Sequence, residues 1–186
     1  MKRFMILLIT ILIMLSGCGS DNEILTAPDA GKEISSNNEF PYFTTQDLYG
    51  NAWTQEIFNE YVLTMVNIWG TYCGPCIDEM PDLGRLYKEL DEMNVNLIGI
   101  MVDVSQKTNK ELALQITEKS GATYTHLLMD ENIFNYLNHN ISAIPTTIFV
   151  DSKGNVVGMP VVGALKKDEY KEIIKERLKA VSMKNE

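Results

Sequence analysis

The sequence of 186 residues has few cysteines, a shortage of basic charge and no visible internal repeat. Its three cysteines are too few for a small domain that depends on many disulfides. Sixteen Lys and Arg oppose 25 Asp and Glu, and no basic run is present, which disfavours nucleic-acid binding. The 45% of hydrophobic residues suits a globular core and excludes wholesale disorder. The length fits one domain with appendages.

A hydrophobic run long enough to span a membrane is also missing. The apolar stretch Phe4–Leu15 is shorter than the roughly 20 residues that a spanning helix needs. A basic pair precedes it and small residues follow it, which is the order of an export signal. Its end, Leu15–Cys18, resembles a bacterial lipoprotein signal. The resemblance implies that residues 1–17 are a signal peptide and that the Cys18 thiol carries a lipid. An uncleaved anchor or an ordinary secretory signal are the alternatives.

The segment after the signal lacks an apolar period. Gly19–Glu39 is rich in Ser, Asn, Asp, Glu and Gly, so residues 18–39 are expected to form a flexible tether to a domain at 40–182. Cleavage would remove the basic pair near the start, so electrostatic attraction to anionic lipid is not expected. Anchoring to the membrane would then depend on acyl chains, of which two give stable attachment.

From Phe40 onward, strand-like and helix-like segments alternate. The predicted strands are Val62–Trp69, Val95–Val104, Thr125–Met129, Thr146–Val150 and Val156–Val162. The predicted helices are Gly74–Asp91, Thr108–Ser120, Glu131–Leu137 and Lys166–Val181. Pro81 is expected to kink the first helix, and a turn at Leu48–Asn51 predicts an N-terminal hairpin. The alternation predicts an α/β fold with a central mixed sheet between helices, extended by that hairpin.

Two cysteines frame a Gly-Pro pair where a buried strand meets a helix. The start of a helix offers unpaired N–H groups and the positive end of its dipole, and both stabilise a thiolate. The thiolate is the nucleophile in thiol–disulfide exchange, and a thiol three residues away can resolve a mixed disulfide. Pro75 suits the first helical turn. The pattern predicts Cys73 as the attacking thiol and Cys76, a turn deeper, as the more shielded resolving thiol.

A purely structural disulfide and half of a zinc site are the other interpretations of this pair. A zinc site needs about four ligands. The remaining cysteine is Cys18, and His126 and His139 lie far along the chain without ligand spacing, so we expect no metal. Both histidines are expected to be surface residues or satisfied internally. Trp69 is expected to be half-exposed near the cysteines, whereas Asp103 either lies at that edge or caps the following segment.

Three segments carry a family resemblance. Trp69–Cys76 resembles the active-site strand-turn-helix of thioredoxins. Val66–Trp69 and Glu79–Pro81 on either side are similar to the membrane-anchored, extracytoplasmic TlpA/ResA-type branch. Ile144–Thr147 matches the loop whose cis proline faces the cysteines. The resemblance covers about Phe40–Val181 and implies a thioredoxin-like fold.

The resemblance also implies an activity. It implies a thiol–disulfide oxidoreductase in which Cys73 and Cys76 form the redox centre beside a cis Pro145, with no separate cofactor. It favours reduction of disulfides in exported client proteins, such as apocytochrome c or methionine sulfoxide reductases. A membrane thiol-reducing transporter would supply electrons to an enzyme that is lipid-anchored on the extracytoplasmic face. A disulfide-forming oxidase, a thiol peroxidase and a non-catalytic binding lipoprotein are the alternatives.

The chain departs from cytoplasmic thioredoxins in three places. Tyr72 replaces a frequent Trp, the segment between Val104 and Thr125 is expanded, and Asn67 replaces a buried Asp. Asn67 cannot ionise, so the proton of Cys76 needs another acceptor. Glu79 lies one turn beyond Cys76 on the same helix face, and the TlpA/ResA-type branch has a Glu in its active site there. We therefore expect Glu79 to accept that proton, directly or through one water; a solvated surface Glu is the alternative.

Overall fold

A five-stranded mixed sheet forms the centre of the domain. The computed structural model describes residues 38–184. The strand order is β5-β4-β3-β6-β7, with bounds β3 (Leu63–Trp69), β4 (Val95–Met101), β5 (Thr125–Leu128), β6 (Thr146–Asp151) and β7 (Val161–Val162). Strands β3, β4 and β5 run parallel, whereas β6 is antiparallel to both β3 and β7. The predicted mixed sheet is therefore confirmed.

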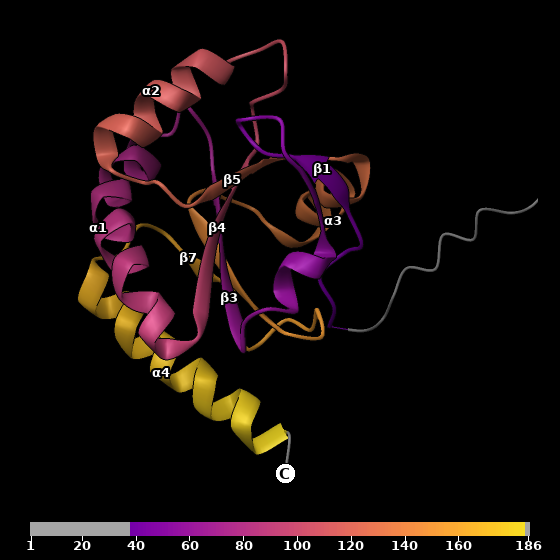
Figure 1. Cartoon of the computed structure of the whole chain (residues 1–186), viewed down its shortest axis with the longest axis vertical. Helices are drawn as coiled ribbons and strands as arrows, with labels where there is room; N and C mark the ends of the chain where they lie inside the picture. The colour runs from indigo at the N-terminus through magenta and orange to yellow at the C-terminus, as the bar shows by residue number, and fades with distance from the viewer. Residues whose placement is uncertain (1–37, 185–186) are drawn as a thin grey trace, which may run out of the picture. The chain divides into compact units, whose positions relative to one another are not determined.

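Helices cover both faces of this sheet. The helices are α1 (Gly74–Leu90), α2 (Lys110–Ser120), α3 (Glu131–Asn140) and α4 (Lys167–Lys184), with 3-10 turns η1 (Gln55–Phe58) and η2 (Asp91–Met93). Figure 1 shows α1, α2 and α4 on one side of the sheet and α3 on the other. Strands β1 (Thr44–Gln46) and β2 (Ala52–Thr54) form the predicted N-terminal hairpin on the α3 side.

Every residue of β3 is buried because both sheet faces are covered. One core lies between the sheet and α1, α2 and α4, and it contains Met65, Leu83 and Ile174. A second core lies on the opposite face, where aromatic rings of the N-terminal segment, including Phe43 and Phe58, pack edge-to-face. This double covering explains why the strands are continuous apolar runs rather than alternating ones.

The last strand of the sheet is shorter than the predicted strand Val156–Val162. Only Val161–Val162 forms a strand, and Val156 makes a single bridge to Val150. Between them, Gly158 has a φ of 73°. Pro160 has no N–H to donate to a ladder. Both residues interrupt the predicted strand Val156–Val162, and only its end pairs with β6, in the antiparallel direction.

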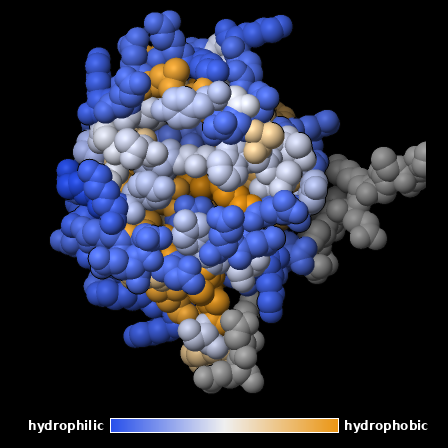
Figure 2. Space-filling model, in the orientation of Figure 1, coloured by the Kyte–Doolittle hydropathy of each residue, from blue (hydrophilic) through white to orange (hydrophobic). Residues whose placement is uncertain are grey.

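The described chain begins at the end of the predicted tether. The signal peptide, Cys18 and most of the tether lie outside the described residues. The Val156 N–H donates to the Asn38 carbonyl at 2.7 Å, and the Phe40 N–H donates to the Gly154 carbonyl at 2.8 Å. Within residues 38–184, no helix has the length and apolar character to span a membrane. Hydrophilic side chains cover most of the face in Figure 2.

Candidate active site

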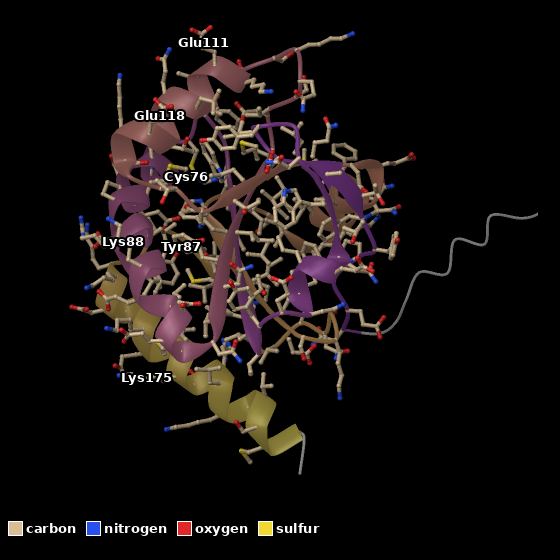
Figure 3. The ribbon with its side chains drawn as sticks, in the orientation of Figure 1. Cys76, Tyr87, Lys88, Glu111, Glu118 and Lys175 are labelled. Carbon is tan, nitrogen blue, oxygen red and sulfur yellow. A yellow bond between two sulfur atoms is a disulfide. The ribbon has the colours of Figure 1, made fainter. Side chains whose placement is uncertain are left out.

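Cys73 and Cys76 are joined by a disulfide at the start of α1. Cys73 is the N-cap residue of the helix, and the Cys76 N–H is directed at the Cys73 Sγ at 3.3 Å. The exposed fraction is 7% for Cys73 and 1% for Cys76, so Cys76 is the more shielded residue, as predicted. In the reduced state, this N–H and the helix dipole would stabilise a thiolate at Cys73. Figure 3 shows Cys76 at the upper end of α1.

The turn that leads into the cysteines is held by Asp103. The backbone N–H of Thr71 donates to the Asp103 carboxylate at 2.9 Å, and the Thr71 hydroxyl donates to its other oxygen. Asn109, at the start of α2, donates to the same carboxylate at 3.2 Å. Of the two interpretations of Asp103, the structure shows the one at the active-site edge. The next residue along the turn, Tyr72, is 72% exposed.

Pro145 lies at the same end of the sheet. The Ile144–Pro145 peptide bond is cis, as predicted. Strand β6 begins directly after it, and Thr146 pairs with Ile68 next to the end of β3. The Pro145 carbonyl accepts a hydrogen bond from the Gly163 N–H at 2.9 Å, which ties the loop to the end of β7. The cis-proline loop and the cysteine turn therefore lie at the same end of the sheet, next to the neighbouring strands β3 and β6.

Glu79 is a buried residue on α1, not a solvated surface one. Only 2% of it is exposed. Its Oε1 accepts a hydrogen bond from the Asn67 amide at 2.9 Å. Its Oε2 accepts from the Tyr170 hydroxyl at 2.9 Å and from the Leu165 N–H at 3.1 Å. Burial raises the pKa of Glu79 above its ordinary value, while these three hydrogen bonds act in the opposite direction. Its catalytic role stays a prediction.

Glu79 contacts a polar row that crosses the sheet beneath α1. The paired registers place Thr147, Asn67, Gly99 and His126 side by side on β6, β3, β4 and β5. The residues flanking this row on the same face are apolar core. A Cβ at Gly99 would lie 2.4 Å from the His126 Nδ1, so the position has no room for a side chain. The row thus forms a buried polar environment behind the cysteines.

The expectation that Trp69 is half-exposed was wrong. Trp69 is fully buried, and its Nε1 donates to the His126 Nδ1 at 3.1 Å. Because Nδ1 accepts, the His126 Nε2 carries the proton and donates to the Ala122 carbonyl at 3.0 Å. Burial lowers the pKa of His126 to about 4, so the ring is neutral. The central strand is covered on both faces, and the indole N–H therefore finds its partner inside the domain.

Sequence reasoning missed the residues that surround Glu79 from other elements. Tyr170 lies in the predicted helix Lys166–Val181, and its hydroxyl contacts both Glu79 and the Thr147 hydroxyl. Tyr124 is also buried, and its hydroxyl has no hydrogen-bond partner among the described residues. A buried tyrosine hydroxyl usually has a partner, but nothing local in the sequence indicates which one.

The polar residues of this region do not form a metal site. No group of three or more His, Cys, Asp or Glu within residues 38–184 is arranged to hold a metal ion. His139 lies exposed on α3, on the other side of the sheet from α1, whereas His126 is fully occupied by its hydrogen bonds.

The fold and the site define the class of protein. The sheet is thioredoxin-like, and a disulfide joins the cysteines of Cys73-Gly74-Pro75-Cys76 at a helix start. A cis-proline loop lies at the same end of the sheet. These are the features of a thiol–disulfide oxidoreductase. The chain belongs to the AhpC/TSA family, whose pattern matches residues 36–159.

Individual relatives agree with this class. Thiol-disulfide oxidoreductase ResA of Bacillus subtilis (strain 168) is 27% identical over 179 residues, which cover 94% of this chain and 95% of that protein. ResA of Halalkalibacterium halodurans is 30% identical over 113 residues, 59% of this chain and 61% of that protein.

Solved structures show the same fold. A thioredoxin family thiol:disulfide interchange protein from Chlorobium tepidum TLS has a TM-score of 0.64 at 23% identity, covering 76% of this chain and 97% of its own. StoA from Bacillus subtilis has a TM-score of 0.56 at 21% identity, covering 70% and 94%. The thioredoxin-like architecture expected from the sequence is thus confirmed.

Proposed function

We propose that the protein reduces disulfides in exported proteins outside the cytoplasmic membrane. The observation that carries the proposal is the asymmetric setting of the two cysteines. Cys73 caps α1 and receives the Cys76 N–H, whereas Cys76 is buried one turn before the carboxyl group of Glu79. The first arrangement favours a nucleophilic thiolate, and the second favours a neutral thiol that must lose its proton to react.

The reaction would proceed in two exchanges. The Cys73 thiolate attacks one sulfur of the client disulfide; that bond breaks, a mixed disulfide forms, and the second client sulfur leaves as a thiolate that takes up a proton. Cys76 then transfers its proton to Glu79 and attacks the Cys73 sulfur. The mixed disulfide breaks, the remaining client sulfur leaves and is protonated, and the Cys73–Cys76 disulfide forms. Two electrons pass from the enzyme to the client.

Regeneration requires a dithiol donor, because the cysteine pair ends the reaction oxidised. A membrane thiol-reducing transporter of the kind implied by the TlpA/ResA resemblance would supply two electrons and two protons and would itself become a disulfide. No separate cofactor enters either half of the cycle. Candidate clients are exported proteins whose disulfides must be opened, including apocytochrome c and methionine sulfoxide reductases.

The surroundings of Cys76 support the reducing direction. A disulfide becomes more oxidising when its reduced form is stabilised, usually by stabilisation of a thiolate. Cys76 lies in an apolar core, and the carboxyl group of Glu79 follows it by one turn on the same face of α1. Both features disfavour a second negative charge on sulfur. The reduced pair is therefore a good electron donor.

The reduction potential of the Cys73–Cys76 pair tests the direction. Equilibration with defined dithiol buffers, followed by the fluorescence of the buried Trp69, should give a value near −270 mV, close to that of thioredoxin. A value near −120 mV, typical of an oxidant, would overturn the reducing assignment. Rapid consumption of peroxide would favour the thiol peroxidase, and complete failure to reduce insulin would favour a binding lipoprotein.

We also propose that residues 1–17 are a signal peptide and that lipid on Cys18 anchors the domain through the tether 18–39. Anchoring and chemistry should then separate. A Cys18→Ala variant should lose lipoprotein processing and stable membrane attachment in cells, while the purified domain 40–182 keeps full dithiol activity. If the variant stays membrane-bound after removal of the signal, the lipid assignment is wrong.

A further inference from the structure

The C-terminal helix supplies a hydrogen-bond donor to the residue behind the cysteines. Tyr170, on α4, is fully buried, and its hydroxyl lies 2.9 Å from the Glu79 Oε2 and 3.2 Å from the Thr147 Oγ1. The Leu165 N–H, just before α4, donates to the same Glu79 oxygen at 3.1 Å. Two of the three donors to Glu79 therefore come from a segment more than 80 residues away in the sequence.

Tyr170 acts toward Glu79 only as a donor. Burial and the neighbouring carboxyl group of Glu79 raise the pKa of Tyr170 above its ordinary value, so its hydroxyl keeps its proton. A hydrogen bond from a neutral hydroxyl to a carboxylate stabilises the ionised carboxylate and lowers its pKa. In a buried site such a bond is stronger than in water, because the surroundings screen it less.

The other groups around Glu79 make the hydrogen bond from Tyr170 important for the charge state of Glu79. Cys76 lies one turn before Glu79 on the same helix face. Tyr170 from α4 and Tyr124 from the segment before β5 are both near enough for the charge of Glu79 to raise their pKa values. The Tyr124 ring packs, tilted by 35°, against the neutral His126. The shift in the pKa of Glu79 arises from burial and from hydrogen bonds with Asn67, Tyr170 and Leu165, with no cation among its causes. The ionised carboxylate is therefore favoured by these hydrogen bonds alone among the causes of the shift.

We propose that Tyr170 is a positioning residue of the reaction: it holds Glu79 in its ionised form and fixes the carboxylate where it receives the proton of Cys76. The proposal rests on the proposed role of Glu79 as proton acceptor. Through Tyr170, the packing of α4 sets how readily the mixed disulfide is resolved, although α4 contributes no reacting atom.

The test is Tyr170→Phe, which removes the hydroxyl and leaves the ring. A client peptide is joined to Cys73 of the variant as a mixed disulfide, and the resolution of this disulfide is followed in a single turnover at a series of pH values. Without the hydrogen bond from the Tyr170 hydroxyl, the pKa of Glu79 should rise. The resolution rate falls toward acidic pH as Glu79 is protonated, and this acid limb of the pH profile should therefore move to higher pH. We expect resolution to slow by about tenfold at mildly acidic pH and not at alkaline pH, while attack by Cys73 is unchanged.

Tyr124→Phe is the matched control. It also removes a buried tyrosine hydroxyl, but one that makes no hydrogen bond to Glu79 or to another described residue. A general loss of packing would affect both variants alike, whereas the proposal requires the pH profile to move only in Tyr170→Phe. If both profiles move equally, the proposal fails.

A double variant separates the proposed role of Tyr170 from the proposed role of Glu79 as proton acceptor, on which it rests. In a Glu79→Gln background, Tyr170→Phe should have no further effect on resolution. If Glu79→Gln slows resolution but Tyr170→Phe leaves the wild-type profile intact, Tyr170 is only a structural residue and Glu79 keeps its role. If Glu79→Gln itself changes nothing, the role of Glu79 fails and the role of Tyr170 fails with it.

A second measurement decides the matter if Tyr170→Phe does not fold. Incorporation of 3-fluorotyrosine at position 170 keeps the ring and the hydroxyl but makes the hydroxyl a stronger donor. The acid limb should then move to lower pH, the direction opposite to that in Tyr170→Phe. A limb that stays in place, or moves to higher pH, overturns the proposal.

Discussion

Replacement of Cys76 with Ala is expected to leave the enzyme covalently joined to its clients. Cys73 keeps the helix N-terminus and the N–H of residue 76 that activate it, so attack on a client disulfide proceeds. Intramolecular resolution is lost, because residues 38–184 contain no cysteine other than Cys73 and Cys76. Turnover of insulin reduction should fall by roughly a thousandfold or more, since an external thiol replaces an intramolecular one. Non-reducing electrophoresis should show a thiol-sensitive adduct.

Cys73→Ala is the control for this experiment. It should be equally inactive but should trap nothing, because the shielded Cys76 does not reach a client. In the reduced wild-type protein, an alkylating reagent at mildly acidic pH should label Cys73 first, since its pKa is expected to lie below the ~8.5 of a free thiol. Adducts in Cys73→Ala, or first labelling of Cys76, would reverse the two roles.

Replacement of Glu79 with Gln is expected to slow resolution by about a hundredfold while attack by Cys73 is little affected. Burial raises the pKa of Glu79, so in the wild type the ionised base is lost as pH falls through this raised value. The wild-type resolution rate should therefore decline toward acidic pH. The variant lacks the titrating group, so its slower resolution step should lose this limb. Single-turnover reduction of a small aromatic disulfide across pH measures both steps.

Asp78→Asn is the matched control for Glu79→Gln. Asp78 is the preceding carboxylate on α1, but it is exposed to solvent. Its neutralisation should leave both steps and their pH profiles unchanged. Resolution that is as fast in Glu79→Gln as in the wild type at every pH would show that Cys76 loses its proton to another group.

Several features of the site could be predicted because they are local. The strand-turn-helix around Cys73 depends on a buried β-branched run followed by a Gly-Pro pair, and these residues are adjacent in the chain. The cis bond before Pro145 was likewise tied to a short motif. By contrast, the expectation that Trp69 is half-exposed was wrong, because β3 is central and both of its faces are covered.

The sequence by itself determined the α/β fold, the position of the redox pair at a helix start and the order of shielding of its two thiols. Each of these follows from neighbouring residues and from the hydrophobic period. Only the tertiary structure decided what surrounds Glu79. The period shows that Tyr170 faces a core, but a polar atom in a core is defined by the partner it meets. Here Asn67, Leu165 and Tyr170 meet one carboxylate through the packing of β3, α1 and α4.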